Sequence, residues 1–167
     1  MTLRAGFPEA TLDRQAPDLV VLSPGPGAPQ DFDVSGTLAA LVRRGLPTFG
    51  VCLGLQGIVE HFGGALGVLD YPMHGKASRV RVVSTGRLFA GLPAEFTAGR
   101  YHSLFALREK LPPELEVTAE SDDGVVMAVE HATLPMAAVQ FHPESIMSLD
   151  DDVGLRLLAN VLAHLRR

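Results

Sequence analysis

The stretch Thr48-Phe-Gly-Val-Cys-Leu-Gly-Leu-Gln56 is the most informative part of the chain for its fold. Its first four residues predict a strand that is buried on both faces, and residues 53–62 predict a helix that begins directly after Cys52. The cysteine therefore lies at a strand-to-helix turn, inside the pattern Gly50-x-Cys-x-Gly54. This pattern is that of a nucleophile elbow, a turn so tight that small residues are required two positions to either side. Such a turn places the cysteine at the carboxyl end of the sheet, where open α/β sheets hold their sites.

Cys52 is the only cysteine among the 167 residues, which excludes an internal disulfide framework and a zinc site built from several cysteines. The unpaired N–H groups at the start of the following helix carry partial positive charge, so we expect a lowered thiol pKa and a reactive thiolate. A lone cysteine is also common as a small buried core residue. The two flanking glycines and the position at the turn favour a catalytic nucleophile over that alternative.

Short apolar runs separated by turn residues continue on both sides of this stretch. Residues 18–22 predict another buried strand, and residues 35–44 predict a helix. Strand–helix alternation with short loops is typical of a parallel sheet covered by helices. Residues 153–165 carry apolar side chains at helical spacing, so the fold class is α/β with three layers. Further strand candidates lie close together without long helices and favour antiparallel additions to the sheet: residues 78–83, 96–101, 115–119, 125–130 and 137–141.

The composition is that of one globular domain spanning residues 1–167. Fourteen Lys and Arg against nineteen Asp and Glu give a formal net charge of −5, and no stretch concentrates the basic residues, which argues against nucleic-acid binding. The longest apolar runs are far too short to cross a bilayer, and the N-terminus lacks the apolar segment of a signal peptide. We therefore expect a cytoplasmic domain with no membrane contact.

A candidate base and its orienting group lie in Phe141-His-Pro-Glu-Ser145, at the end of the apolar strand 137–141. His142 would sit on the same rim of the sheet as Cys52. Residues two apart in an extended segment point the same way, so Glu144 can accept the ring N–H of His142 and fix its tautomer. Taken alone, His-x-Glu is a weak signal. No metal site is expected, because the other histidines follow no metal-ligand spacing: His61, His74, His102, His131 and His164.

A glycine-rich loop, Pro24-Gly-Pro-Gly27, follows the strand at residues 18–22. Its glycines let the backbone approach a ligand closely, and its prolines stiffen that backbone. The loop lacks the third glycine of a dinucleotide fingerprint and the Gly-Lys-Ser/Thr of a phosphate loop. By itself it reads as a rigid turn. On the same rim as Cys52 it becomes a candidate donor of a backbone N–H to an oxyanion.

Three segments together resemble the class I glutamine amidotransferases, the cysteine-triad glutaminase domains that feed ammonia to a synthase. They are Ser23-Pro-Gly-Pro-Gly27, Phe49-Gly-Val-Cys-Leu-Gly-Leu-Gln56 and Val139-Gln-Phe-His-Pro-Glu-Ser145. Met73-His-Gly-Lys76 and Arg100-Tyr-His-Ser-Leu104 look like further segments of the family in the same order, so the resemblance covers essentially the whole chain. It implies a flavodoxin-like fold with a mostly parallel central sheet. Within the family the chain is most similar to the glutaminase components of anthranilate synthase, including fused ones, and those of aminodeoxychorismate synthase carry much the same motifs.

The resemblance also implies a reaction and its residues. L-Glutamine would be hydrolysed at its side-chain amide by Cys52 as nucleophile, with His142 as base and acid and Glu144 as the group that orients the histidine. The ammonia would pass to a chorismate-using synthase, for tryptophan with anthranilate synthase or for folate with aminodeoxychorismate synthase. No metal or organic cofactor is implied for this domain. The implied oxyanion and glutamine contacts are the backbone N–H groups of Gly25 and Leu53, then Gly27, Gln56 and the backbone of Ser103 and Leu104.

One departure from the family pattern lies at the N-terminus. The family opens with an apolar strand and a helix, whereas residues 1–6 look like the start of the second strand–helix unit, so we expect a shortened domain that lacks the first unit. Residues 2–5 would then form an edge strand, and residues 18–22 would have no partner on one side. We expect residues 1–14 to be displaced or loosely packed, and Val20 and Leu22 to be less buried than an inner strand requires.

Two other functions stay open on the sequence alone. An incomplete fold is compatible with a binding or regulatory module that keeps the triad but no longer turns over, and the same triad serves other amide or peptide substrates in the wider superfamily. The Pro-Gly-Pro-Gly loop and Gln56 favour glutamine. Residues 71–76 are polar, contain a glycine and show no periodicity, so we expect a loop there, either at the surface that meets the synthase or as an ordinary surface loop.

Overall fold

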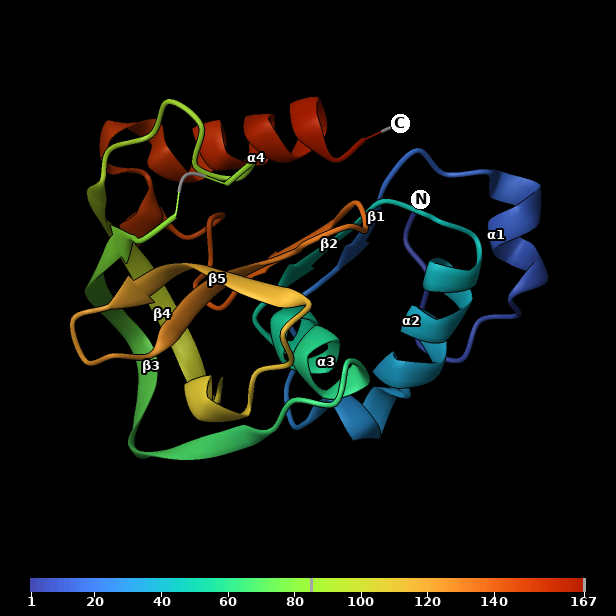
Figure 1. Cartoon of the computed structure of the whole chain (residues 1–167), viewed down its shortest axis with the longest axis horizontal. Coiled ribbons are helices and arrows are strands. Elements are labelled where there is room, and N and C mark those ends of the chain that lie inside the picture. Colours follow the sequence, from blue (N-terminus) through green and yellow to red (C-terminus); the bar gives the residue numbers. More distant parts are fainter. Residues whose placement is uncertain (85, 167) are drawn as a thin grey trace.

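The computed structural model describes residues 1–84 and 86–166. Its strands form one seven-stranded sheet in the order β1-β2-β7-β6-β5-β3-β4 (Figure 1). β1, β2 and β7 run parallel, whereas the pairings from β7 through β6, β5 and β3 to β4 are antiparallel, so the sheet is mixed. The strands are β1 (Val20–Leu22), β2 (Thr48–Val51), β3 (Leu66–Val82), β4 (Glu95–Ala106), β5 (Leu115–Ser121), β6 (Val126–His131) and β7 (Met136–Val139).

Helices cover both faces of this sheet and make the fold three-layered (Figure 1). Side chains alternate across a strand, so β2 and β7 bury one set on each face. On one face Phe49 shares a core cluster with Leu157 of α4, and on the other Ala138 shares a cluster with Ile58 of α3. The predicted α/β class is confirmed. The α-helices are α1 (Ala10–Gln15), α2 (Val34–Arg43), α3 (Leu53–His61) and α4 (Val153–His164), with 3₁₀ turns at Pro29–Phe32, Arg108–Lys110, Ile146–Ser148 and Asp150–Asp152.

The parallel strands carry the segments that the sequence singled out. The glycine-rich loop follows β1, Cys52 follows β2, and His142 lies three residues beyond the end of β7. Since these neighbours run parallel, their carboxyl ends meet at one edge of the sheet. The strand order therefore brings all three segments to one rim, as predicted. No helix in residues 1–84 and 86–166 is long and apolar enough to cross a membrane.

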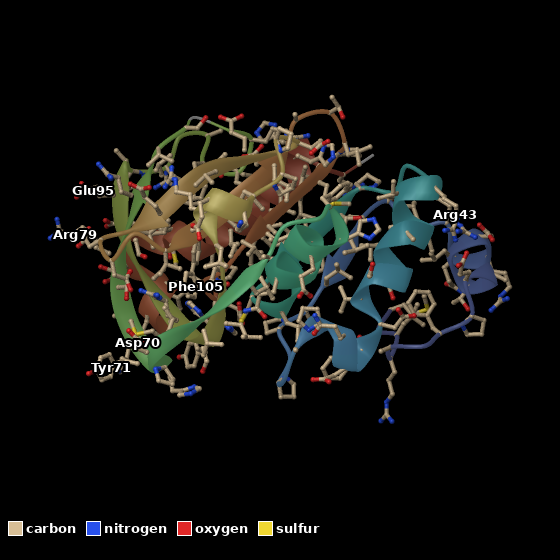
Figure 2. All side chains as sticks on the ribbon, turned by 60° about the horizontal axis from the view of Figure 1, so that its bottom comes forward. Arg43, Asp70, Tyr71, Arg79, Glu95 and Phe105 are labelled. Carbon is tan, nitrogen blue, oxygen red and sulfur yellow. The ribbon has the colours of Figure 1, made fainter. Side chains whose placement is uncertain are left out.

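The N-terminal segment differs from the prediction. Residues 2–5 form no strand, and residues 1–6 are exposed. The first element is instead α1, whose Leu12 is buried in a small cluster with Leu41 of α2. Arg43 at the end of α2 and Arg44 just after it bind Glu9 before α1, and Arg44 also binds Asp13. Figure 2 shows Arg43 beside α1. The outer edge of β1 stays unpaired among the described residues, so residues 2–5 do not add a strand there, and the N-terminal segment is held by the packing of α1 on α2 instead.

β1 is an edge strand of three residues that pairs, within the described residues, with β2 alone. Val21 is 55% exposed, while Val20 and Leu22 are half-buried. The expectation that these two residues are less buried than an inner strand requires is confirmed. The short length limits the number of unpaired backbone groups at this edge.

The long hairpin of β3 and β4 corrects a second prediction. Residues 71–76, expected to form a loop, lie inside β3 and pair with β4 through two register shifts, between Val68 and Met73 and between His74 and Lys76. Asp70 and Tyr71 lie at the outer bend of this strand (Figure 2). Most side chains of the segment are exposed, so no alternation between apolar and polar residues marks it as a strand. Gly75, at a φ of +67°, adopts the left-handed backbone at one of the register shifts.

Candidate active site

Cys52 occupies the turn between β2 and α3 with φ +53° and ψ −100°, a conformation that L residues rarely adopt. The chain crosses itself closely at this turn. A Cβ added to Gly50 would lie 2.7 Å from the carbonyl carbon of Gly54, and one added to Gly54 would lie 2.6 Å from the carbonyl oxygen of Leu22. The Cys52 N–H donates to the Val139 carbonyl at 2.8 Å, which ties the turn to β7. The geometry of the predicted elbow is confirmed.

His142 and Glu144 form a hydrogen-bonded pair, as the spacing predicted. Nδ1 of His142 lies 2.7 Å from Oε1 of Glu144. A carboxylate only accepts, so in the neutral imidazole the proton is on Nδ1 and Nε2 carries the lone pair that a base needs. The His142 side chain is 13% exposed and that of Glu144 is 53% exposed. Nε2 is buried and makes no hydrogen bond to any described residue.

The backbone around His142 is fixed by β4 and the turn at Ile146–Ser148. The His142 N–H donates to the Gly99 carbonyl at 2.9 Å, and the His142 carbonyl accepts from the Ser148 hydroxyl at 2.6 Å. The Tyr101 ring meets the imidazole edge-on, with ring centroids 4.8 Å apart. The Tyr101 hydroxyl lies 3.1 Å from Oγ of Ser145. These contacts hold the imidazole plane from the side of β4.

The thiol differs from the prediction in its partner and in its acidity. No hydrogen bond in the described residues joins Cys52 Sγ to His142. Sγ instead accepts from the side-chain amide of Gln140, with Nε2 at 3.5 Å. Burial raises the pKa of the Cys52 thiol to about 11, against the opposing hydrogen bonds from the Leu53 N–H and Gln140. The prediction that the start of α3 lowers the thiol pKa is therefore wrong, because the loss of hydration on burial outweighs the effect of the nearby N–H groups.

The residues implied to hold glutamine gather on α3 and β4. Gln56 lies one helical turn after Cys52, is 3% exposed, and donates through Nε2 to the Leu104 carbonyl at 3.1 Å. Ser103, beside Leu104 on β4, is half-buried. This places the backbone of residues 103–104 beside the helix that follows the thiol, as the resemblance implied.

The glycine-rich loop also lies against the start of α3. A Cβ added to Gly25 would be 3.3 Å from the Leu53 side chain, so the two residues whose N–H groups are the implied oxyanion donors are neighbours. Gly27 has a φ of +74°, and its turn is closed by Asp31, which accepts from the Ala28 N–H at 2.8 Å. A side chain at Gly27 would clash with that carboxylate.

Sequence reasoning missed a buried polar network behind these residues. Arg100 on β4 is 1% exposed, pairs with both oxygens of Asp123 at 3.0 Å, and donates through Nε to Nε2 of His102 at 3.1 Å. His102 then donates through Nδ1 to the Leu104 carbonyl at 2.9 Å. Burial, then the Arg100 charge, lowers the pKa of His102 to about 4, so this imidazole stays neutral. The only sequence signal was that Arg100 and His102 belong to one of the family-like segments.

A buried thiol at a strand-to-helix elbow, with a His–Glu pair just beyond the end of the neighbouring parallel strand, is the arrangement of a cysteine-nucleophile α/β enzyme. Among the described residues no group of His, Cys, Asp and Glu could hold a metal ion. The family profile of the class I glutamine amidotransferases matches residues 4–161. The chain belongs to this family.

Individual relatives agree with this assignment. The chain is 65% identical over 164 residues to an anthranilate synthase of Azospirillum brasilense, which covers 98% of this chain and 22% of the relative. It is 54% identical over 144 residues to an aminodeoxychorismate synthase of Streptomyces griseus, covering 86% of this chain and 19% of the relative. The chain thus spans about a fifth of the length of these two relatives. A solved structure from Thermoplasma acidophilum, described as part of a GMP synthase, superposes with a TM-score of 0.81 at 28% identity, covering 94% of this chain and 76% of that one.

Proposed function

We propose that this chain is a glutaminase that hydrolyses L-glutamine through Cys52, His142 and Glu144 and supplies ammonia to a chorismate-using synthase. The observation that carries the proposal is the His142–Glu144 hydrogen bond of 2.7 Å on the same rim as the elbow thiol, in a chain of this family. We infer that residues 1–167 act as one glutamine amidotransferase domain and that it works in the cytoplasm.

The reaction follows from the protonation states. Nε2 of His142 takes the thiol proton, and the Cys52 thiolate adds to the side-chain carbonyl carbon of glutamine. The backbone N–H groups of Leu53 and Gly25 stabilise the oxyanion that forms. The imidazolium, held by Glu144, protonates the leaving nitrogen, the C–N bond breaks, and ammonia departs from a glutamyl thioester. His142 then deprotonates water, which attacks the thioester, and glutamate leaves as the proton returns to Sγ.

The raised pKa of the Cys52 thiol makes His142 essential for this first step. A thiol with a pKa of about 11 is almost entirely protonated at neutral pH, so the nucleophile forms only when Nε2 is brought within reach of Sγ. Nε2 is buried, has no hydrogen-bond partner in residues 1–84 and 86–166, and is oriented by Glu144 to accept. We expect glutamine and the synthase to bring these two atoms together, which would limit hydrolysis to the complex.

The synthase is inferred from the relatives. Identity of 65% to an anthranilate synthase against 54% to an aminodeoxychorismate synthase favours anthranilate as the product into which the ammonia nitrogen is incorporated. The synthase would be a fused domain or a separate chain. An inactive binding module, or a triad acting on another amide, is the alternative that the experiment must exclude.

The test is glutamate release from L-glutamine, measured with and without a chorismate-using synthase. Hydrolysis that the synthase stimulates, with asparagine and acetamide left intact, supports the proposal. Hydrolysis of other amides at the same kcat/KM contradicts the substrate, and no hydrolysis of any amide in the complex supports a binding module.

A further inference from the structure

A buried glutamine links the thiol to the residues implied to bind substrate. Gln140 lies directly after β7 and its side chain is fully buried, at 0% exposure. Its Nε2 is 3.5 Å from Sγ of Cys52, and its Oε1 is 3.4 Å from Nε2 of Gln56. The NH₂ group and the oxygen of one side-chain amide therefore both make contacts, the first with the sulfur of Cys52 and the second with Gln56 on α3.

The direction of these hydrogen bonds is fixed from the Leu104 end. A carbonyl oxygen only accepts, so Gln56 presents its NH₂ group to Leu104. The same NH₂ group faces Gln140, which must present its oxygen there. The NH₂ group of Gln140 consequently faces Sγ, and the sulfur is the acceptor.

Packing alone does not explain an amide at this position. An apolar side chain of similar volume would fill the space without the cost of burying polar groups. What the amide adds is a donor to Sγ and an acceptor for Gln56. The backbone of Gln140 is also held by the sheet, since its N–H donates to the Met127 carbonyl of β6 at 2.8 Å.

We propose that Gln140 is a positioning residue, which holds the Cys52 sulfur and the Gln56 amide in one hydrogen-bonded unit. The chain of contacts runs from Sγ through Gln140 and Gln56 to the Leu104 carbonyl. Movement of Gln56 or of residue 104 when glutamine binds would be transmitted to the sulfur. The part that concerns glutamine rests on the proposed function, whereas the contact with the sulfur does not.

The proposal predicts an effect on the ionisation of the thiol. A hydrogen bond donated to sulfur is stronger when the sulfur is a thiolate, so it favours the charged form. Removing the donor should raise the thiol pKa by about one unit, the shift that corresponds to losing one hydrogen bond to a charged group. Below its pKa, the thiol would then react about tenfold more slowly with an electrophile.

The test uses Gln140→Met, which removes donor and acceptor, and Gln140→Glu, which keeps an oxygen for Gln56 but removes the donor to sulfur. Gln15→Met is the matched control, because Gln15 is exposed at the end of α1. The rate of alkylation of Cys52 by iodoacetamide is measured from pH 6 to pH 11 without glutamine. Glutamine hydrolysis with the synthase is measured in parallel.

We expect both Gln140 variants to shift the alkylation profile to higher pH, Glu further than Met because its carboxylate opposes a thiolate, and the control to leave it unchanged. Hydrolysis by Gln140→Met should lose kcat. A profile that superposes on that of the unsubstituted chain would overturn the proposal. Should neither variant fold, the unsubstituted chain decides: the side-chain NH₂ signal of Gln140 should shift when Cys52 is alkylated, and an unmoved signal would overturn the proposal. If the Gln140 variants shift the alkylation profile as expected but the unsubstituted chain hydrolyses no glutamine, only the proposed function is refuted.

Discussion

Gly54→Ala tests the tightness of the elbow. A methyl group at residue 54 would lie 2.6 Å from the carbonyl oxygen of Leu22 and 2.9 Å from its Cβ. The carbonyl belongs to the backbone of β1 and cannot rotate away, so the start of α3 must move off the strand. Forcing one extra carbon into a packed site costs about 1–3 kcal/mol. Alanine returns up to about 1 kcal/mol through its helix propensity.

With that return the net loss should be up to about 2 kcal/mol, which for a chain of this size lowers Tm by up to roughly 8 °C. The same movement displaces Cys52 and the Leu53 N–H, and a displacement of about 1 Å costs roughly a hundredfold in rate. We expect kcat for glutamine to fall at 25 °C, where the variant is still folded. Gly36→Ala is the control, because Gly36 is exposed on α2, far from the thiol in the chain, and the nearest atoms to its methyl group belong to the exposed carboxylate of Asp33, which can rotate at the cost of its hydrogen bond from the Gly36 N–H. A Tm and a kcat that match those of the control would show that the elbow tolerates a side chain at residue 54 and that its tightness is not needed for activity.

Contacts around the site lead to three further predictions. Glu144→Gln removes the carboxylate that fixes the His142 tautomer, so kcat should fall at least about a hundredfold while KM changes little. The control Glu109→Gln, at an exposed residue, should have no effect, and an unchanged kcat in Glu144→Gln would exclude Glu144 from the mechanism. The pKa of His102 is about 4 in the folded chain against 6.5 for a free imidazole, so the unfolded chain takes up the proton first as pH falls. Urea titrations should therefore show the free energy of unfolding dropping by up to about 3 kcal/mol between pH 7 and pH 4. The drop should be smaller in His102→Gln, and an identical pH dependence in that variant would contradict the role of His102. His74 of β3 lies opposite Tyr101 of β4 in the strand register, and the Tyr101 ring packs on His142. Replacing His74 and Lys76 should therefore reduce the stimulation by the synthase more than the basal hydrolysis, and an equal loss in both would contradict a role at the synthase surface.

The sequence predicted those parts of the fold and site that depend on local spacing. The elbow around Cys52 needed only the two glycines and the change from a buried strand to a helix, and the His142–Glu144 pair needed only residues two apart. The helices were expected at residues 35–44, 53–62 and 153–165, and their ends agree with those of α2, α3 and α4 to within one residue. Burial of these elements on one or both faces produced a clear apolar pattern.

What the sequence did not predict depends on tertiary neighbours. Residues 71–76 lack an apolar pattern because β3 is exposed there, so a strand looked like a loop. The segment at residues 2–5 resembled a strand, but it stays outside the described sheet, and the N-terminal region is held by α1 packing on α2, a tertiary contact. The thiol pKa was expected to fall with the helix start, and the depth of burial, which reverses the direction, is visible only in the packed structure. Gln140 reaches Cys52 from 88 residues away along the chain, which no local pattern encodes.

Covalent catalysis by Cys52 is tested most directly by mass spectrometry of the Cys52 peptide after rapid acid quench of the complex turning over L-glutamine. We predict a glutamyl thioester on Cys52, which accumulates when water attack is slowed and is absent in Cys52→Ala. That variant should lose glutamate release but keep synthesis from free ammonia. Glutamate release that persists in Cys52→Ala, or a covalent adduct on any residue other than Cys52, would contradict the proposed mechanism.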